Sequence, residues 1–270
     1  MGCSAISVVT SCSAAGWRAY GRRFVETFGQ HWPAEVRPLL YTEDALDDLQ
    51  PRLAGLPILS LFDASPAARA FAERHRGSAR AHGKERRQMD VGWTPNKVRG
   101  GHNFRYDAFR FAKKVFAVEA AAREVGGGRL FWVDADVVTF APVPPALLDE
   151  LLPLTAAISA LLRDGAPTET GFVGYDLDQE ACRAFIAELE RLYASDEVFA
   201  LQEWHDGWVF EWLRKKMGVP THAIPHCSRR QPFINSRLGE FLDHTKGRNK
   251  ALGRTPKELR LVRDEVAYWR

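Results

Sequence analysis

The sequence of 270 residues has few cysteines and no long apolar run. Its four cysteines form no CxxC pair or other metal-ligand spacing, so we expect reduced thiols rather than a disulfide framework or a zinc site. No stretch approaches the roughly 18 continuous apolar residues of a membrane span. The first residues, MGCSAISVVTSCS, lack the basic flank and the length of a secretory signal. These absences predict a cytoplasmic protein without a transmembrane segment, with peripheral attachment to a membrane as the alternative.

A strong charge of one sign is also missing. The net charge is +3, with 37 basic and 34 acidic residues, and this balance argues against a nucleic-acid partner. The hydrophobic share of 46% suffices for a sizeable core. We find no internal repeat and no linker that divides the chain into comparable halves, so we expect one domain over residues 1–270.

Short apolar runs alternate with helical patterns along the chain. This alternation is typical of an α/β domain whose central sheet is mostly parallel and flanked by helices. The clearest helical pattern covers 104–124, where Ala108, Phe111, Val115 and Val118 recur at helical spacing. We expect strands at 5–11, 36–41, 57–63, 129–134, 156–162, 171–177 and 221–225, and helices near 16–31, 66–76, 104–124, 178–194 and 203–217.

The segment 74–103, RHRGSARAHGKERRQMDVGWTPNKVRGGHN, stands apart because it is basic, glycine-punctuated and without periodicity. Long loops inside compact domains are usually functional or disordered. It is therefore either a solvated insertion or a lid that contacts an anionic substrate.

Two carboxylates, Asp134 and Asp136, follow the apolar run Leu130–Val133. In α/β sheets, ligands bind beyond the carboxyl ends of the strands, which is where these side chains should lie. Two neighbouring anions repel each other unless a cation compensates, and Mg²⁺ or Mn²⁺ accepts such oxygen ligands. The alternative is that one aspartate caps the next turn and the other is merely exposed.

A second pattern, HxxGxxK, occurs in DHTKGRNK as His244, Gly247 and Lys250. An imidazole can complete a metal's ligand shell, glycine lets backbone N–H groups approach phosphate, and lysine neutralises phosphate charge. The three residue types thus serve one purpose if a metal-bound diphosphate is present. Otherwise the segment is an ordinary basic surface.

This order of motifs resembles the GT-A glycosyltransferases, particularly the glycogenin and lipopolysaccharide galactosyltransferase-like group. The resemblance extends from TSCS after the first strand through YDAFRFAKKVF, the DxD strand, TETGFVGYD and EWHDGWVFE to HxxGxxK. One departure is that Ala-Leu-Gly follows Lys250 where the family has Pro-Trp. The resemblance implies a Rossmann-like GT-A fold in which Asp134, Asp136 and His244 hold Mn²⁺ (or Mg²⁺). That ion would bridge the diphosphate of a nucleotide sugar, usually UDP-linked.

The resemblance also implies roles for residues outside the metal shell. Gly247 and Lys250 would contact the phosphates, Arg110 would reach the donor, and Lys114 shares its helical face. Lys114 could equally belong to an ordinary charged surface. The other expected contacts are Thr10 and Ser11 for the base or ribose, and Glu169, Thr170, Gly171, Trp204, His205 and Asp206 for the sugar.

The implied activity is transfer of a sugar to the hydroxyl of an unidentified carbohydrate, lipid-linked or protein acceptor. HxxGxxK occurs in retaining enzymes, so we expect retention. An inverting enzyme would need a general base, for which Asp206 and Glu169 are the candidates. Asp206 has a second interpretation, as a negative charge at a helix N-terminus.

Three alternatives stay open. A haloacid-dehalogenase-type phosphatase also places DxD after an apolar strand, but its motif usually opens the domain and continues Gly-Thr. A nucleotidyltransferase that makes nucleotide sugars would want a glycine-rich basic loop after the first strand, and CSAAGWRAYGRR resembles one poorly. The third is a non-catalytic sugar- or nucleotide-binding protein on the same fold.

Overall fold

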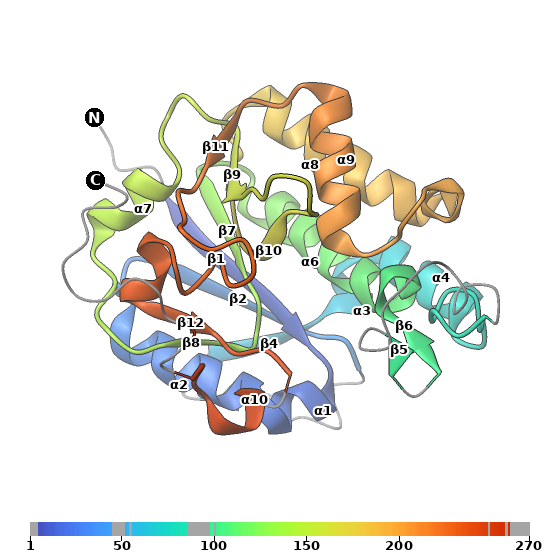
Figure 1. The fold of residues 1–270 in the computed structure, drawn as a ribbon, viewed down its shortest axis with the longest axis horizontal. Coiled ribbons are helices and arrows are strands. Elements are labelled where there is room, and N and C mark those ends of the chain that lie inside the picture. Colours follow the sequence, from blue (N-terminus) through green and yellow to red (C-terminus); the bar gives the residue numbers. More distant parts are fainter. Residues whose placement is uncertain are drawn as a thin grey trace.

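A mixed sheet of eight strands forms the centre of the computed structural model, which describes residues 5–44, 52–53, 56–85, 98–99, 101–247, 249–256 and 259 (Figure 1). The strand order is β11-β9-β10-β7-β1-β2-β4-β3. β10 is antiparallel to both β7 and β9, β3 is antiparallel to β4, and the other neighbours are parallel. The expected α/β class with a mostly parallel sheet is therefore confirmed. The strands are β1 Ile6–Cys12, β2 Arg37–Thr42, β3 Arg52–Leu53, β4 Leu56–Ser60, β7 Arg129–Val133, β9 Ile158–Leu161, β10 Glu169–Asp176 and β11 Thr221–Ala223.

Helices cover both faces of this sheet (Figure 1). In β7, Leu130 and Trp132 belong to one buried apolar cluster, and Phe131 and Val133 to another on the opposite face. This burial on both faces explains why the strand is a continuous apolar run. The first face packs against α3 Leu61–Ala64, α4 Pro66–His75, α6 Ala108–Val125, α8 Glu180–Ala194 and α9 Asp206–Met217. The second packs against α1 Ala14–Gly16, the π-helical turn η1 Trp17–Gly21, α2 Arg22–His31, α7 Pro145–Leu151 and the short helix η5 Arg237–Glu240.

A second, two-stranded sheet lies beside the first and was not predicted from the sequence. It pairs β8 Val137–Thr139 with β12 Leu242–His244 in antiparallel register, so that His244 lies opposite Val137 (Figure 1). Each strand has three residues, too few for a periodic pattern to stand out. This pairing brings the HxxGxxK segment close to the turn that contains Asp134 and Asp136. The short helix α10 Asn249–Leu252 comes after β12 and contains Lys250.

Two expected elements differ from those observed. The apolar run at 57–63 is a strand only to Ser60, because the Ser60 hydroxyl accepts a hydrogen bond from Asp63 N and begins α3 there. The helix expected at 16–31 is three consecutive segments, α1, η1 and α2. The other principal helices begin and end within a few residues of their expected positions.

Part of the basic segment 74–103 falls outside the described residues, since 86–97 and 100 are not among them. Its described parts include the end of α4 and the two-residue strands β5 Val98–Arg99 and β6 His102–Asn103, which pair with each other. The remaining described elements are the short helices η3 Phe104–Tyr106 and η4 Glu197–Ala200. Of the described helices, none combines the length and apolarity that a membrane crossing requires.

Candidate metal centre and substrate cleft

Asp134 and Asp136 lie in the turn between β7 and β8, beyond the carboxyl end of β7. The turn is held by a hydrogen bond from Val137 N to Asp134 O at 2.9 Å, and Asp134 N donates to Gly171 O at 2.9 Å. β1 and β2 end at the same edge of the sheet, so the turn borders the region where α/β folds bind ligands. The Asp136 side chain is buried and that of Asp134 is partly exposed.

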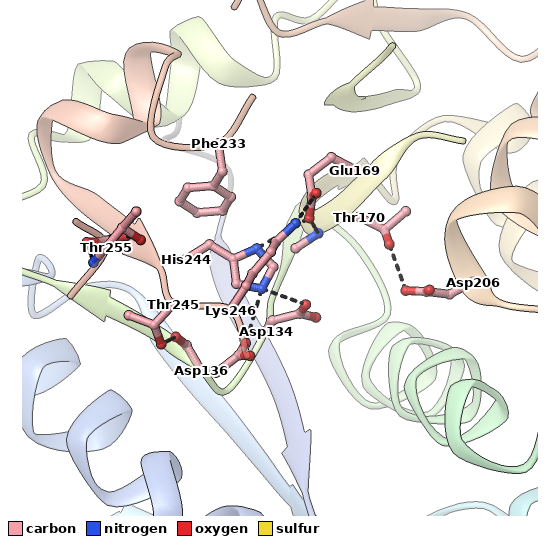
Figure 2. A network of polar contacts seen from close by, with 12 residues as sticks. Asp134, Asp136, Glu169, Thr170, Asp206, Phe233, His244, Thr245, Lys246 and Thr255 are labelled. Atoms are coloured by element: carbon pink, nitrogen blue, oxygen red, sulfur yellow. Dashed lines mark hydrogen bonds and ion pairs between the residues drawn. The ribbon is translucent and has the colours of Figure 1, made fainter. Parts of the chain in front are cut away.

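His244 completes a cluster of three potential metal ligands, two carboxylates and an imidazole (Figure 2). Its Nε2 lies 3.4 Å from Asp134 Oδ2 and 3.2 Å from Asp136 Oδ1. One ligand atom from each of the three residues lies within 4.8 Å of the others. Two carboxylates and an imidazole suit Mn²⁺ and related divalent ions. The residues therefore fit a divalent cation, and the candidate metal site expected from the sequence is present.

The far side of the His244 ring faces β10. His244 Nδ1 lies 3.3 Å from Glu169 Oε1, and Lys246 pairs with the other oxygen of that carboxylate. Gly171 N donates to Glu169 Oε1 at 3.3 Å. A Cβ on Gly171 would lie 2.4 Å from His244 Nδ1, so the ring can take this position only beside a glycine.

Two lysines compensate the carboxylates of the cluster. Lys250 Nζ lies 2.6 Å from Asp136 Oδ2. Lys114 Nζ, from α6, lies 3.2 Å from Asp134 Oδ1 and 2.8 Å from Asp206 Oδ2. The Lys114 side chain is thus part of the site rather than of an ordinary charged surface.

These contacts shift the pKa values of the buried groups. Burial alone would lower the pKa of His244, but the Asp136 carboxylate outweighs it and raises that pKa to about 9. Burial would raise the pKa of Asp136, yet His244 and Lys250 hold it well below its usual range. Burial likewise opposes ionisation of Asp206, but Lys114 lowers its pKa to about 2. In the metal-free protein His244 is therefore an imidazolium, which must lose a proton before it can bind a metal.

A cavity of about 350 Å³ opens beside the cluster. Five carboxylates and four cationic side chains line its described surface, so its formal charge is slightly negative. A bound divalent cation would make this charge positive and suited to a diphosphate. The charged lining residues are Glu43, Asp107, Asp134, Asp136, Asp206, Arg110, Lys113, Lys114 and Lys250.

Of the remaining residues expected from the sequence, some line this cavity or contact its lining, and others are buried elsewhere. Ser11 lines it, and Thr170 donates its hydroxyl to Asp206 Oδ2 at 2.6 Å. Gly247 has a φ of 58°, a left-handed conformation that favours glycine, in the turn before α10. Thr10, Trp204 and His205 are buried and are not among the residues that line the cavity.

The structure gives physical reasons for that burial. Thr10 lines a small apolar pocket with Trp17 and Phe24. Trp204 packs in the core and donates Nε1 to Leu201 O at 3.0 Å. His205 Nε2 lies 3.0 Å from the buried Glu203 Oε2. Direct contact of these three side chains with a donor or sugar stays a prediction.

Sequence reasoning missed Tyr20, Glu43, Lys113 and Lys246 as residues of the site. Tyr20, in the π-helical turn, lines the cavity, and Lys250 Nζ lies 4.9 Å from the centroid of its ring. Glu43 accepts from Ser11 Oγ at 2.9 Å and lies 3.3 Å from Lys113 Nζ. The position of Glu43 directly after β2 was an available signal, because ligands bind beyond strand ends.

Comparison with known proteins finds likenesses at the level of structure. No protein-family model matches the sequence, and no curated protein matches it. The apo form of mouse xyloside xylosyltransferase 1 is similar over 81% of this chain and 84% of that one, with 12% identity and a TM-score of 0.47. The apo form of the glycosyltransferase GlyE of Streptococcus pneumoniae TIGR4 is similar over 80% of this chain and 44% of its own, with 13% identity and a TM-score of 0.44. A second GlyE structure gives 12% identity, 82% and 45% coverage and a TM-score of 0.43.

This chain spans less than half the length of the GlyE chains. These solved structures are described as glycosyltransferases.

Proposed function

We propose that this protein is a metal-dependent glycosyltransferase that moves a sugar from a nucleotide donor, UDP-linked, to an acceptor hydroxyl. The observation that carries the proposal is the convergence of Asp134, Asp136 and His244 beside a cavity with several cationic side chains. Such a set can hold a divalent cation and a diphosphate together. The order of sequence motifs supports the same interpretation.

The metal, Mn²⁺ or Mg²⁺ held by Asp134, Asp136 and His244, would supply a Lewis acid for the charge that develops on the leaving diphosphate. The chain's own cations would assist by binding phosphate oxygens. Lys250 is the first of these, since its Nζ is already beside Asp136 at the cavity. Arg110 is the second, because it lines the same cavity from the first turn of α6. We assign both to donor binding.

The sugar would lie toward Asp206, at the beginning of α9. Its carboxylate accepts from Thr170 Oγ1 and pairs with Lys114, and its low pKa keeps it ionised at neutral pH. An ionised carboxylate fixed by two partners is a strong acceptor for sugar hydroxyls. Because Lys114 also contacts Asp134, it links the sugar end of the cavity to the metal end.

We further propose that transfer retains the anomeric configuration. An inverting enzyme needs a carboxylate free to deprotonate the acceptor. Around the described cavity, Glu43 pairs with Lys113, Asp107 with His102 and Asp206 with Lys114. Each of these carboxylates already has a cationic or hydrogen-bonding partner, which makes it a weak general base.

The test is donor hydrolysis and donor binding. UDP-, GDP-, CMP- and TDP-sugars are screened by thermal shift with and without Mn²⁺, because a ligand of the folded state alone raises its stability. We expect one donor to stabilise the protein in a Mn²⁺-dependent way and to release its nucleoside diphosphate slowly in water. Asp134→Asn should abolish both effects. The control is Asp149→Asn, which removes a carboxylate of the same charge from an exposed pair with Arg129.

Other outcomes would point elsewhere. Pyrophosphate release from a nucleoside triphosphate and a sugar phosphate would identify a nucleotidyltransferase. Stabilisation by a nucleotide sugar without any hydrolysis or transfer would identify a binding protein. Donor binding that is independent of divalent cations would contradict the metal assignment.

A further inference from the structure

We propose that Glu169 is a positioning residue that fixes the His244 ring for metal binding, and that it does not act on the substrate. This inference rests on the proposed metal site and assigns Glu169 a different role from the general base expected for an inverting enzyme. Figure 2 shows Glu169 on the side of the His244 ring opposite the two aspartates. The ring thus lies between the candidate metal ligands and a third carboxylate.

Neighbouring groups contact both oxygens of the Glu169 carboxylate. Its Oε1 accepts from Gly171 N at 3.3 Å, and its Oε2 is paired with Lys246. Only 6% of the residue is exposed, and it is not among the residues that line the cavity. A carboxylate that is buried and engaged at both oxygens is poorly placed to take a proton from an acceptor hydroxyl.

The His244 ring is confined as well. The ring of Phe233 packs against it at a centroid distance of 5.3 Å, and Gly171 leaves room for it on the β10 side. Nε2 points to Asp134 and Asp136, whereas Nδ1 is buried without an aligned hydrogen bond and lies 3.3 Å from Glu169 Oε1. The orientation of the ring therefore decides which nitrogen faces the metal.

A histidine that binds metal through Nε2 keeps its proton on Nδ1, and that proton is usually donated to a carboxylate or carbonyl. Glu169 Oε1 is the acceptor at the required position. A small rotation of the ring toward Glu169 would align the N–H. Lys246 offsets the charge of Glu169, so the carboxylate can remain buried beside two other anions.

The experiment is a double-mutant cycle on Mn²⁺ affinity in the absence of nucleotide, read by electron paramagnetic resonance of free Mn²⁺. The variants are Glu169→Ala, His244→Ala and the double variant, with Asp149→Asn as the remote charge control. We expect Glu169→Ala to weaken Mn²⁺ binding by about 10–100-fold, the usual effect of removing an outer-shell partner. In the His244→Ala background the same change should have almost no effect, because Glu169 acts through the imidazole. Glu169→Gln should retain most of the affinity, since its amide oxygen can accept from Nδ1–H.

The outcomes separate this inference from the proposed function. Equal losses in both backgrounds would mean that Glu169 acts on the metal directly or through its charge, and would overturn the proposal. Unchanged affinity in Glu169→Ala would overturn it too, while the metal site itself would stand. Failure of the wild-type protein to bind Mn²⁺ would remove the metal assignment.

A second measurement needs no substitution. Nitrogen-15 NMR of histidine in the wild-type protein, with Zn²⁺ as a diamagnetic probe, reports which ring nitrogen carries the proton. We expect His244 to be protonated at Nδ1 and metal-bound at Nε2. The opposite tautomer would overturn the proposal even if Glu169→Ala could not be purified in folded form.

Discussion

Lys250 Nζ lies 2.6 Å from Asp136 Oδ2, so the lysine assigned to the phosphates is paired with a carboxylate assigned to the metal. The two partners come from α10 and from the turn after β7, and the β8–β12 pairing brings them together. In the metal-free protein, Lys250 and protonated His244 together neutralise Asp136. Metal binding must therefore replace part of this pairing, which makes Lys250 available for a phosphate.

The first prediction is that Lys250→Met has opposite effects on the two ligands. Mn²⁺ alone should bind more tightly, because a cation that competes for Asp136 is gone. UDP at saturating Mn²⁺ should bind more weakly by about 1.5–3 kcal/mol, the range for a hydrogen bond to a charged group. Calorimetric titration of each ligand measures both effects. Lys215→Met, at an exposed position of α9, is the control, and weaker binding of both ligands to Lys250→Met would contradict the competition.

The second prediction concerns the two aspartates. Asp134→Asn and Asp136→Asn should each abolish Mn²⁺ binding and transfer. Asp136→Asn should also lower the free energy of unfolding more, because its side chain is 8% exposed and Lys250 loses the carboxylate with which it pairs. The Asp134 side chain is 28% exposed, and its partners Lys114 and His244 keep contacts with other carboxylates. Urea denaturation of the metal-free variants measures the difference. Equal stability of the two variants would show that Asp136 does not stabilise the cluster as its burial suggests.

The third prediction is a pH dependence of metal affinity. His244 has a pKa of about 9 in the metal-free protein, so below pH 9 a proton must leave before the imidazole can bind metal. Mn²⁺ affinity should rise roughly tenfold per pH unit between pH 6.5 and 8.5. In His244→Ala this slope should disappear. A pH-independent affinity in the wild type would exclude His244 as a ligand.

The same pKa fixes the sign of the stability change in the absence of metal. Because the folded-state pKa of His244 is raised above its ordinary value of 6.5, its stabilising contribution is fully present below pH 6.5. This contribution is lost as pH rises through about 9. The unfolding free energy of the wild type should therefore fall over this range relative to that of His244→Ala, as measured by urea denaturation at each pH.

The fourth prediction concerns Gly171. A Cβ there would lie 2.4 Å from His244 Nδ1, so Gly171→Ala should displace the ring and weaken Mn²⁺ binding. The overpacking should cost about 1–3 kcal/mol of stability. Gly29→Ala, in α2 where no atom lies within 4 Å of the new Cβ, is the matched control and should be neutral or stabilising. Normal Mn²⁺ affinity in Gly171→Ala would show that the ring position does not matter.

The sequence by itself determined the class of the fold and the first half of the site. The apolar run before Asp134 predicts a strand because β7 is buried on both faces, and burial on both faces requires apolar residues throughout. The helix at 104–124 was equally clear, since α6 has one side on the sheet. Both predictions rest on the local spacing of apolar residues, because this spacing indicates which faces of a strand or helix are buried.

Only the tertiary structure decided how the second half of the site is assembled. The pairing of β8 with β12 places His244 opposite Val137, and neither strand is long enough to have a recognisable period. The role of Glu169 also depends on tertiary contacts. This residue of β10 pairs with Lys246 and lies beside His244, and both of these come from the C-terminal part of the chain. The burial of Trp204 and His205 was likewise not evident from the aromatic composition of their segment. Short strands and single buried charges are stabilised by contacts distant in sequence, so no local pattern could reveal them.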